Sequence, residues 1–198
     1  MILTISCSVF AFIVGSIPFG IVFSRLFGKK DPREVGSGNI GATNVLRSSG
    51  NKSIAVLTLI ADIVKGSIVV LLANQIQNQY NFFLTLELLC GLAAILGHIF
   101  SPFVKFKGGK GVATALGVFF VLAPYLSLLS LGIFVLIAVT TRIVSISSLI
   151  AVIAFPISSV IFNYSLNLTF LSIIIAFLIF FRHKENIMRL INRVENKF

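Results

Sequence analysis

A glycine- and lysine-rich stretch between two long apolar runs has the strongest potential for chemistry in this sequence. It reads GHIFSPFVKFKGGKGVATALG, from Gly97 to Gly117. Glycine lets backbone N–H groups converge on a bound anion, because no Cβ blocks the approach or the positive φ angles of such a loop. Lysine adds compact positive charge. The stretch predicts a phosphate-binding loop formed by Lys105, Lys107, Gly108, Gly109, Lys110 and Gly111.

A second interpretation of this stretch stays open. The nucleotide-binding pattern G-x-x-x-x-G-K-[ST] fails here, because Lys110 is followed by Gly111. Connectors between membrane helices carry excess lysine on the cytoplasmic side. The same residues could therefore form a flexible basic connector between two membrane helices.

The segment GSGNIGATNVLR, from Gly36 to Arg47, has a similar character. Its backbone amides, hydroxyls and carboxamides can hydrogen-bond an oxyanion, and an arginine fork suits phosphate or carboxylate. A plain connector needs fewer such groups, so we favour a functional loop over a structural turn. The candidate residues are Ser37, Asn39, Thr43, Asn44 and Arg47.

The basic tail contains RHKENIMRL, residues 182–190. On a helix, Arg182, Asn186 and Arg189 lie near one face, with His183 beside them. A basic interfacial helix would explain the lysine and the arginines, but it does not explain His183 and Asn186. We therefore expect phosphate-binding chemistry in this segment as well.

Several catalytic classes are excluded by the motifs. The chain has no paired carboxylates at glycosidase spacing, no G-x-S-x-G elbow and no metal-binding His/Cys cluster. The acyltransferase pattern H-x-x-x-x-D is absent, because Phe103 stands five residues after His98 and Met188 five after His183. The sequence thus predicts no metal and no cofactor, and any acyl transfer would use a different arrangement.

The composition is that of an integral membrane protein. Of 198 residues, 57% are hydrophobic and 11% charged, whereas soluble domains have about 45–50% and about 25%. The net charge of +10 favours an anionic membrane surface or anionic substrates over nucleic acid, because the charges lie in short patches between apolar segments. We expect one domain, residues 1–198, with Cys7 and Cys90 as packing residues. Protein partners stay unknown at this stage.

Hydropathy predicts an all-α bundle of seven transmembrane helices. A span needs about 20 residues and at least about 17, so the long run from Val112 to Thr141 is divided at Pro124. The first run is interpreted as an uncleaved span and not a signal peptide, because no basic residue precedes it. The predicted spans are 2–24, 53–73, 82–99, 112–124, 125–140, 146–162 and 168–181.

The distribution of basic residues supports seven spans. Residues 25–65 contain seven Lys or Arg, residues 105–110 three and the tail from Arg182 five, whereas 74–81 and 163–167 contain none. With seven spans every basic segment faces one side, but with six the tail would face away from the others. The positive-inside rule then predicts an external N-terminus and a cytoplasmic C-terminus.

Three ionisable residues fall inside predicted spans. Asp62 and Lys65 are one helical turn apart, and we favour a mutual ion pair in the bundle interior over direct chemistry. Glu87 is a functional candidate or a structural hydrogen-bonding residue. These residues leave a membrane transporter or channel for a phosphorylated solute as the alternative function. Against it, the polar motifs collect on one face and no inverted repeat is visible.

Five motifs in order resemble those of the bacterial acyl-phosphate:glycerol-3-phosphate acyltransferases, the PlsY family. They are GSIPFG (15–20), GSGNIGATNVLR (36–47), DIVKG (62–66), GHIFSPFVKFKGGKGVAT (97–114) and RHKENIMRL (182–190), and the resemblance runs the full length. It implies a seven-helix fold in the bacterial inner membrane, with the motifs on the cytoplasmic side. It also implies that a fatty acyl group moves from acyl phosphate to the 1-hydroxyl of glycerol 3-phosphate in phospholipid synthesis. The products are lysophosphatidic acid and phosphate.

The resemblance also implies roles for individual residues. The implied catalytic residues are Ser37, Arg47, His183 and Asn186. The residues implied to surround the acyl phosphate are Asn39, Thr43 and Asn44. The residues implied to bind glycerol 3-phosphate are Lys105, Lys107, Gly108, Gly109, Lys110 and Gly111, and Ser147 is placed with the substrate-binding residues.

Two questions remain within the resemblance. The family usually has Gly-x-Glu near the C-terminal end, where this chain has Arg193-Val194-Glu195. The acceptor hydroxyl also needs a base, for which His183 and a substrate phosphate oxygen are candidates. Acyl phosphate is an activated anhydride and both substrates are anionic, so the main tasks are positioning and charge stabilisation. We favour the substrate phosphate, because the loops offer no obvious carboxylate.

Overall fold

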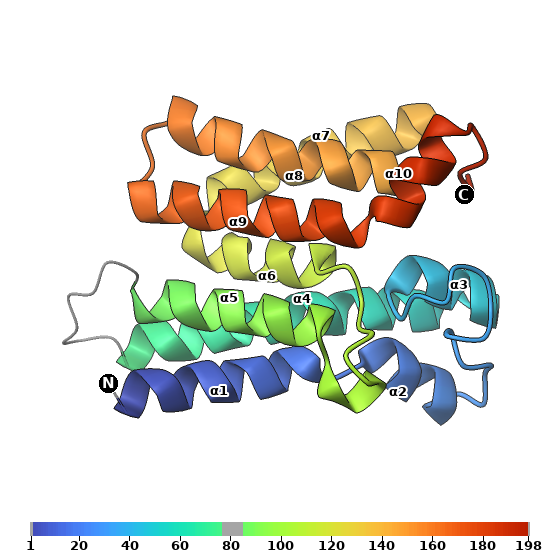
Figure 1. Cartoon of the computed structure of the whole chain (residues 1–198), viewed down its shortest axis with the longest axis horizontal. Helices are drawn as coiled ribbons and strands as arrows, with labels where there is room; N and C mark the ends of the chain where they lie inside the picture. The colour runs from blue at the N-terminus through green and yellow to red at the C-terminus, as the bar shows by residue number, and fades with distance from the viewer. Residues whose placement is uncertain (1, 77–84, 198) are drawn as a thin grey trace. The chain divides into compact units, whose positions relative to one another are not determined.

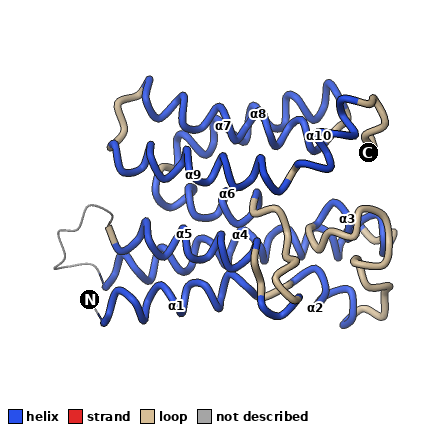
Figure 2. Tube along the Cα trace, in the orientation of Figure 1, coloured by secondary structure: helices blue, strands red, loops and turns tan. Residues whose placement is uncertain are grey.

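The computed structural model describes residues 2–76 and 85–197, and every regular element in these ranges is a helix (Figure 2). The α-helices are α1 (Ile2–Ser16), α2 (Phe19–Leu26), α3 (Ala42–Ser49), α4 (Lys52–Ile76), α5 (Leu86–Ile99), α6 (Val112–Leu122), α7 (Pro124–Thr141), α8 (Val144–Ile161), α9 (Leu166–Arg182) and α10 (Lys184–Ile191). A 3-10 helix, η1 (Pro102–Val104), follows α5.

Several of these helices suit a membrane. Four are long and apolar enough to cross it, namely α4, α5 together with η1, α7 and α8. Two bent pairs raise the number to six, α1 with α2 at 42° and α9 with α10 at 63°. The 11 residues of α6 rise about 16 Å, about half of a hydrocarbon core.

The predicted all-helical membrane architecture is therefore confirmed for the described residues. The count of seven spans and the orientation of the termini stay predictions. The uncharged loop 74–81 and the start of the predicted span 82–99 fall partly outside the described residues.

The chain divides into two compact units, residues 1–118 and 119–198, with the boundary inside α6. In the first unit α1, α4 and α5 run side by side (Figure 1). Glycine allows α1 and α5 to approach closely. A Cβ on Gly15 would collide with the backbone of Ala94, and one on Gly97 with the backbone of Phe12. This is the small-residue packing typical of membrane helices.

The motif GSIPFG interrupts the first predicted span, residues 2–24. Pro18 has no N–H and opposes a continuous helix, so α1 and α2 are separate and bent. The carbonyl oxygen of Ser16 accepts a hydrogen bond from Ser101 Oγ (2.6 Å). The carbonyl oxygen of Ile17 accepts one from Lys65 Nζ (2.9 Å). The break is therefore held by side chains from α4 and from the residue that precedes η1.

The second unit contains α7, α8 and α9 side by side, and α10 turns away at the bend (Figure 1). Phe119 of α6 stacks on Phe155 of α8 with ring centroids 4.2 Å apart. The hydroxyl oxygens of Ser159 and Thr169 lie 2.6 Å apart and link α8 to α9. These contacts join α8 to α6 and to α9. The start of α8 carries Ser147, and His183 follows the end of α9.

Candidate active site

The first polar loop is folded around the side chain of Asn44, at the start of α3. Its Oδ1 accepts the N–H of Ser37 (2.9 Å). Its Nδ2 lies within hydrogen-bond distance of the carbonyl oxygens of Pro32 (2.6 Å), Val35 (3.0 Å) and Asn39 (2.8 Å). Asn44 is also only 3% exposed. The hydrogen bonds of Asn44 therefore shape the loop, and its contact with acyl phosphate stays a prediction.

Backbone turns account for other residues of this loop. Gly36 and Gly38 have φ angles of 64° and 67°, a left-handed conformation that glycine adopts without steric cost. The Asn39 side-chain oxygen accepts the N–H of Gly41 (2.9 Å), a local turn just before α3. Asn39 therefore also has a structural task in the loop.

Ser37, Thr43 and Arg47 are placed differently. Ser37 and Thr43 are half-buried, and Arg47 is exposed. Thr43 and Arg47 are four residues apart on α3 and so share a face. A Cβ on Gly36 would lie 3.9 Å from the Cβ of Arg47. Gly36, the residue before Ser37, therefore lies beside the start of the Arg47 side chain.

The start of the loop depends on Asp31, which the sequence analysis missed. Asp31 Oδ1 accepts hydrogen bonds from the backbone N–H (3.0 Å) and Nε (2.9 Å) of Arg33, and Oδ2 accepts one from Arg33 Nη2 (2.6 Å). Arg25 Nη2 lies 3.7 Å from Oδ2. The hydrogen bonds from Arg33 lower the pKa of Asp31 to about 2. The D-x-R spacing was the available signal, because an Asp side chain can bond the backbone two residues on.

Both candidate phosphate-binding loops of the first unit rest on α2. Ile21 of α2, Ile40 of the first loop and Val104 of η1 form one buried cluster, and each is 3–4% exposed. A Cβ on Gly20 would collide with the carbonyl oxygen of Ile40, so glycine permits this approach. Val104 directly precedes Lys105. The structure therefore brings two loops that are far apart in the sequence onto one short helix.

Internal hydrogen bonds and close packing shape the glycine loop, residues 105–111. The N–H of Gly108 donates to the carbonyl oxygen of Ile99 (3.1 Å), and that of Gly109 to the carbonyl oxygen of His98 (3.0 Å). A Cβ on Gly108 would collide with these carbonyl groups, and one on Gly109 with the imidazole of His98. Gly111 has a φ of 88°. Close packing and backbone conformation therefore account for these glycines, and a phosphate-binding role for Gly108 and Gly109 stays a prediction.

Lysine side chains supply the positive charge of this loop. Lys105 and Lys107 are exposed and Lys110 is half-buried. Lys105 and Phe106 both have positive φ angles, 54° and 60°, a local strain that is often found at functional sites. Lys110 is two residues before α6, whose N-terminal end favours negative charge. A phosphate here would be bound mainly by side-chain charge.

The predicted ion pair between Asp62 and Lys65 is confirmed. Oδ1 and Nζ are 2.8 Å apart, and the side chains are 4% and 3% exposed. His98 Nδ1 lies 3.6 Å from the same Asp62 oxygen, a third member that the sequence did not indicate because it lies on α5. Glu87 Oε1 lies 3.5 Å from Thr85 Oγ1 in the first turn of α5. A carboxylate stabilises a helix N-terminus, which supports the structural interpretation of Glu87.

His183 is buried at the bend between α9 and α10. It is 2% exposed, and its Nδ1 lies 2.8 Å from the carbonyl oxygen of Ile179. A carbonyl oxygen only accepts, so Nδ1 carries the proton in this contact. In the neutral imidazole the lone pair is then on Nε2. This geometry selects Nε2 as the atom that can accept a proton.

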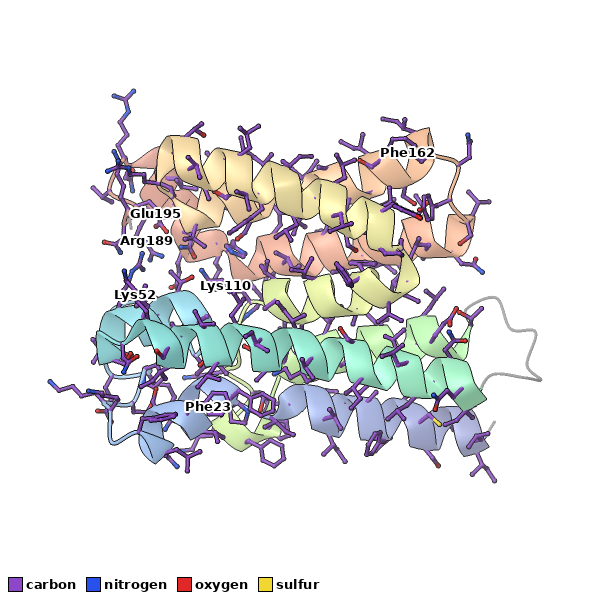
Figure 3. The ribbon with its side chains drawn as sticks, turned by 180° about the vertical axis from the view of Figure 1, so that it is seen from behind. Phe23, Lys52, Lys110, Phe162, Arg189 and Glu195 are labelled. Atoms are coloured by element: carbon purple, nitrogen blue, oxygen red, sulfur yellow. The ribbon has the colours of Figure 1, made fainter. Side chains whose placement is uncertain are left out.

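Glu195 gathers the polar residues of the second unit. Its Oε1 accepts hydrogen bonds from Asn186 Nδ2 (2.6 Å) and Ser145 Oγ (3.0 Å), and its Oε2 accepts one from Arg189 Nε (2.6 Å). Burial raises the pKa of Glu195, but these three hydrogen bonds outweigh it and hold the pKa below its ordinary value. Figure 3 shows Arg189 and Glu195 at the same end of this unit. The carboxylate orients Asn186 and ties α10 to the start of α8.

The turn after α10 explains how this chain positions Glu195 without the usual glycine. The N–H of Arg193 donates to the carbonyl oxygen of Leu190 (3.1 Å), and that of Val194 to the carbonyl oxygen of Arg189 (2.9 Å). This is a Schellman motif, whose left-handed residue is usually glycine. Arg193 occupies that position with a φ of 59°. Arg193 therefore forms the same turn although it stands where the family usually has glycine, and this turn brings Glu195 back toward α10.

Ser147 hydrogen-bonds the backbone at the start of its own helix, α8. It is fully buried, and its Oγ donates to the carbonyl oxygen of Ile143 (2.8 Å), one turn earlier. A phosphate needs donors, and this hydroxyl proton is used inside the helix. A substrate-binding role for Ser147 stays a prediction, and Ser145, two residues earlier, is the residue that joins the Glu195 cluster.

The Glu195 cluster generates a prediction about acid stability. Glu195→Gln should lower the thermal midpoint by several degrees at neutral pH, because charge-assisted hydrogen bonds contribute about 1–3 kcal/mol. The depressed pKa means that this stability is present above the unfolded pKa of about 4.3 and is lost as the pH falls through the folded value. The midpoints of the two proteins should therefore converge below about pH 4. Glu185→Gln, at an exposed carboxylate on α10, is the control, and equal midpoints at neutral pH would contradict the prediction.

Comparisons with known proteins cover nearly the whole chain. The family model for glycerol-3-phosphate acyltransferase matches residues 5–193. A glycerol-3-phosphate acyltransferase of Endomicrobium trichonymphae is 46% identical over 197 residues, which cover 100% of this chain and 96% of the relative. Glycerol-3-phosphate acyltransferase 2 of Bacillus anthracis is 44% identical over 189 residues, which cover 96% of each chain. A crystal structure of PlsY (YgiH), an integral membrane glycerol 3-phosphate acyltransferase in its glycerol 3-phosphate form, is similar with a TM-score of 0.90 at 41% identity, covering 98% of this chain and 95% of that chain. This chain therefore belongs to the glycerol-3-phosphate acyltransferase family.

Proposed function

We propose that this membrane enzyme transfers a fatty acyl group from acyl phosphate to the 1-hydroxyl of glycerol 3-phosphate. The acceptor oxygen forms a bond to the acyl carbonyl carbon, and the bond from that carbon to the phosphate oxygen breaks. The products are lysophosphatidic acid and inorganic phosphate, in the synthesis of phospholipids. The match to the glycerol-3-phosphate acyltransferase family over residues 5–193 is the observation that carries the proposal.

The first unit is proposed to hold the two phosphate groups. Ser37 and Thr43 are half-buried and Arg47 is exposed, and their hydroxyls and guanidinium fork are proposed to hydrogen-bond acyl phosphate. Lys105, with its neighbours Lys107 and Lys110, would neutralise glycerol 3-phosphate. Both loops rest on α2, so two anions could be held near one another against their mutual repulsion. The rate then comes from positioning and charge stabilisation.

His183 and Asn186 of the second unit are proposed as catalytic residues. Asn186 is oriented by Glu195, and His183 presents Nε2 as its accepting atom. We favour a substrate phosphate oxygen as the base that takes the hydroxyl proton, with His183 as a hydrogen-bonding partner. No metal or cofactor is required for this reaction, because the anhydride is already activated.

The same proposal includes one domain in a bacterial inner membrane, with seven spans, an external N-terminus and a cytoplasmic active site. In the first unit, Lys52 and Lys110 lie away from the N-terminal end (Figures 1 and 3). In the second unit, Arg189 lies at the end opposite Phe162, which precedes the uncharged turn (Figure 3). This polarity of charge within each unit supports the orientation. The seventh passage would be made by the short helix α6.

The activity test uses purified protein in detergent. We expect phosphate release that needs both acyl phosphate and glycerol 3-phosphate, with one lysophosphatidic acid formed for each phosphate. Arg47→Ala should lower kcat/KM by about 100-fold or more, because it removes a charge-assisted contact to a phosphate. The alternative, a transporter or channel for a phosphorylated solute, predicts uptake of glycerol 3-phosphate into vesicles without chemical turnover. Uptake without phosphate release would overturn the proposal.

The orientation is tested by cysteine labelling in a protein that lacks Cys7 and Cys90. A cysteine in place of Lys107, an exposed side chain, should not react with an impermeant thiol reagent applied to intact cells. A cysteine in place of Asn78, which lies outside the described residues, should react because the uncharged loop is predicted to be external. Labelling of Lys107→Cys from outside would contradict the predicted orientation with seven spans.

The identity of the base is tested with His183. If a substrate phosphate is the base, His183→Gln should keep appreciable kcat, mainly raise a KM and retain the acidic limb of the kcat–pH profile. If His183 is the base, the same substitution should lower kcat by about 100-fold or more and abolish that limb. We expect the first result, because glutamine can still hydrogen-bond a phosphate oxygen. Loss of the acidic limb in folded protein would assign the proton transfer to His183.

A further inference from the structure

Three buried ionisable side chains, Asp62 and Lys65 of α4 and His98 of α5, lie next to the glycine loop or to the break after α1, and the proposed reaction does not use them. Lys65 Nζ donates to the carbonyl oxygen of Ile17 (2.9 Å) at the break between α1 and α2, and pairs with Asp62 Oδ1 (2.8 Å). His98 Nδ1 lies 3.6 Å from the same oxygen. Each of the three side chains is 3–5% exposed. Charged groups buried this deeply persist when they are paired and have a task.

His98 connects these charges to the glycine loop in two ways. Its carbonyl oxygen accepts the N–H of Gly109 (3.0 Å), and the next carbonyl, that of Ile99, accepts the N–H of Gly108 (3.1 Å). Its imidazole also occupies the space where a Cβ on Gly109 would stand, with Nε2 as the nearest atom. The loop backbone is thus stacked against the ring, and Lys110 follows directly.

We propose that Asp62, Lys65 and His98 are positioning residues. They hold the backbone of the glycine loop in the position from which its lysines bind glycerol 3-phosphate. Asp62 fixes the position of the His98 ring, and the ring fixes Gly109. Lys65 links the same carboxylate to the bend after α1, so α2 and the glycine loop share one buried anchor. Glycine at 109 is required by the ring and not by a phosphate.

A double-mutant cycle tests this proposal, which rests on the assignment of the glycine loop to glycerol 3-phosphate. Gly109→Ala should raise KM for glycerol 3-phosphate about tenfold, because the added methyl displaces the ring and the loop. KM for acyl phosphate should stay within about twofold. In a His98→Ala background the ring is absent, so adding Gly109→Ala should raise KM no further. Gly132→Ala is the matched control, because a Cβ there meets nothing within 4 Å.

The outcomes separate three interpretations. If the two changes multiply their effects on KM, the methyl acts on a bound phosphate and the proposal is overturned. If the acyl phosphate KM moves instead, the loop serves the other substrate. Asp62→Asn is nearly isosteric and should raise KM for glycerol 3-phosphate in the same direction, and an unchanged KM in folded protein would also overturn the proposal.

Thermal unfolding gives a readout that does not depend on turnover. Gly109→Ala should lower the thermal midpoint in the wild-type background but not in the His98→Ala background. If His98→Ala folds and the double variant does not, the proposed contact is wrong. A folded wild-type protein without phosphate release would contradict the proposed function alone, and the midpoint cycle would still decide whether the ring holds the loop.

Discussion

The first unit depends on the buried contacts of the Lys65 ammonium, which bonds the backbone at the break between α1 and α2 and pairs with Asp62. Pro18 interrupts the first apolar segment, and the carbonyl oxygen of Ile17 accepts hydrogen bonds from Phe19 N–H (3.1 Å) and from Lys65 Nζ (2.9 Å). The buried charge of Lys65 needs a counter-ion, which Asp62 provides. Removing one partner from a buried pair costs about 3–5 kcal/mol. The break, the cation and the carboxylate therefore belong together physically.

The break also creates the support for the candidate site. Because α2 is separate from α1, it can carry Ile21 toward both Ile40 and Val104. The two loops then present their polar residues from one platform. Within the loops, glycines and asparagines mostly serve the backbone, as the contacts of Asn44 and Gly109 show. The proposed function therefore assigns recognition of phosphate to the lysines, the arginine and the hydroxyls.

In the second unit, a carboxylate near the C-terminus, that of Glu195, accepts hydrogen bonds from buried and half-buried polar side chains. Glu195 satisfies donors from three positions and so holds α10 against α8. Its approach requires a left-handed residue, which costs an ordinary side chain about 1–2 kcal/mol. Arg193 adopts that conformation, so three hydrogen bonds to one buried carboxylate offset a local conformational cost.

The sequence by itself determined the membrane class, the helical architecture and the pairing of Asp62 with Lys65. These follow from local composition and from spacing along one helix, which depend on neighbours in the chain. Only the tertiary structure decided which donors meet which acceptors. The contact of His98 with Asp62 and Gly109, the seating of both loops on α2 and the hydrogen bonds of Glu195 join residues on different elements. Their partners depend on how helices pack, and one sequence does not encode that geometry in any local pattern. For the same reason, residue types suited to phosphate, such as Gly108, Asn44 and Ser147, proved to bond the protein's own backbone.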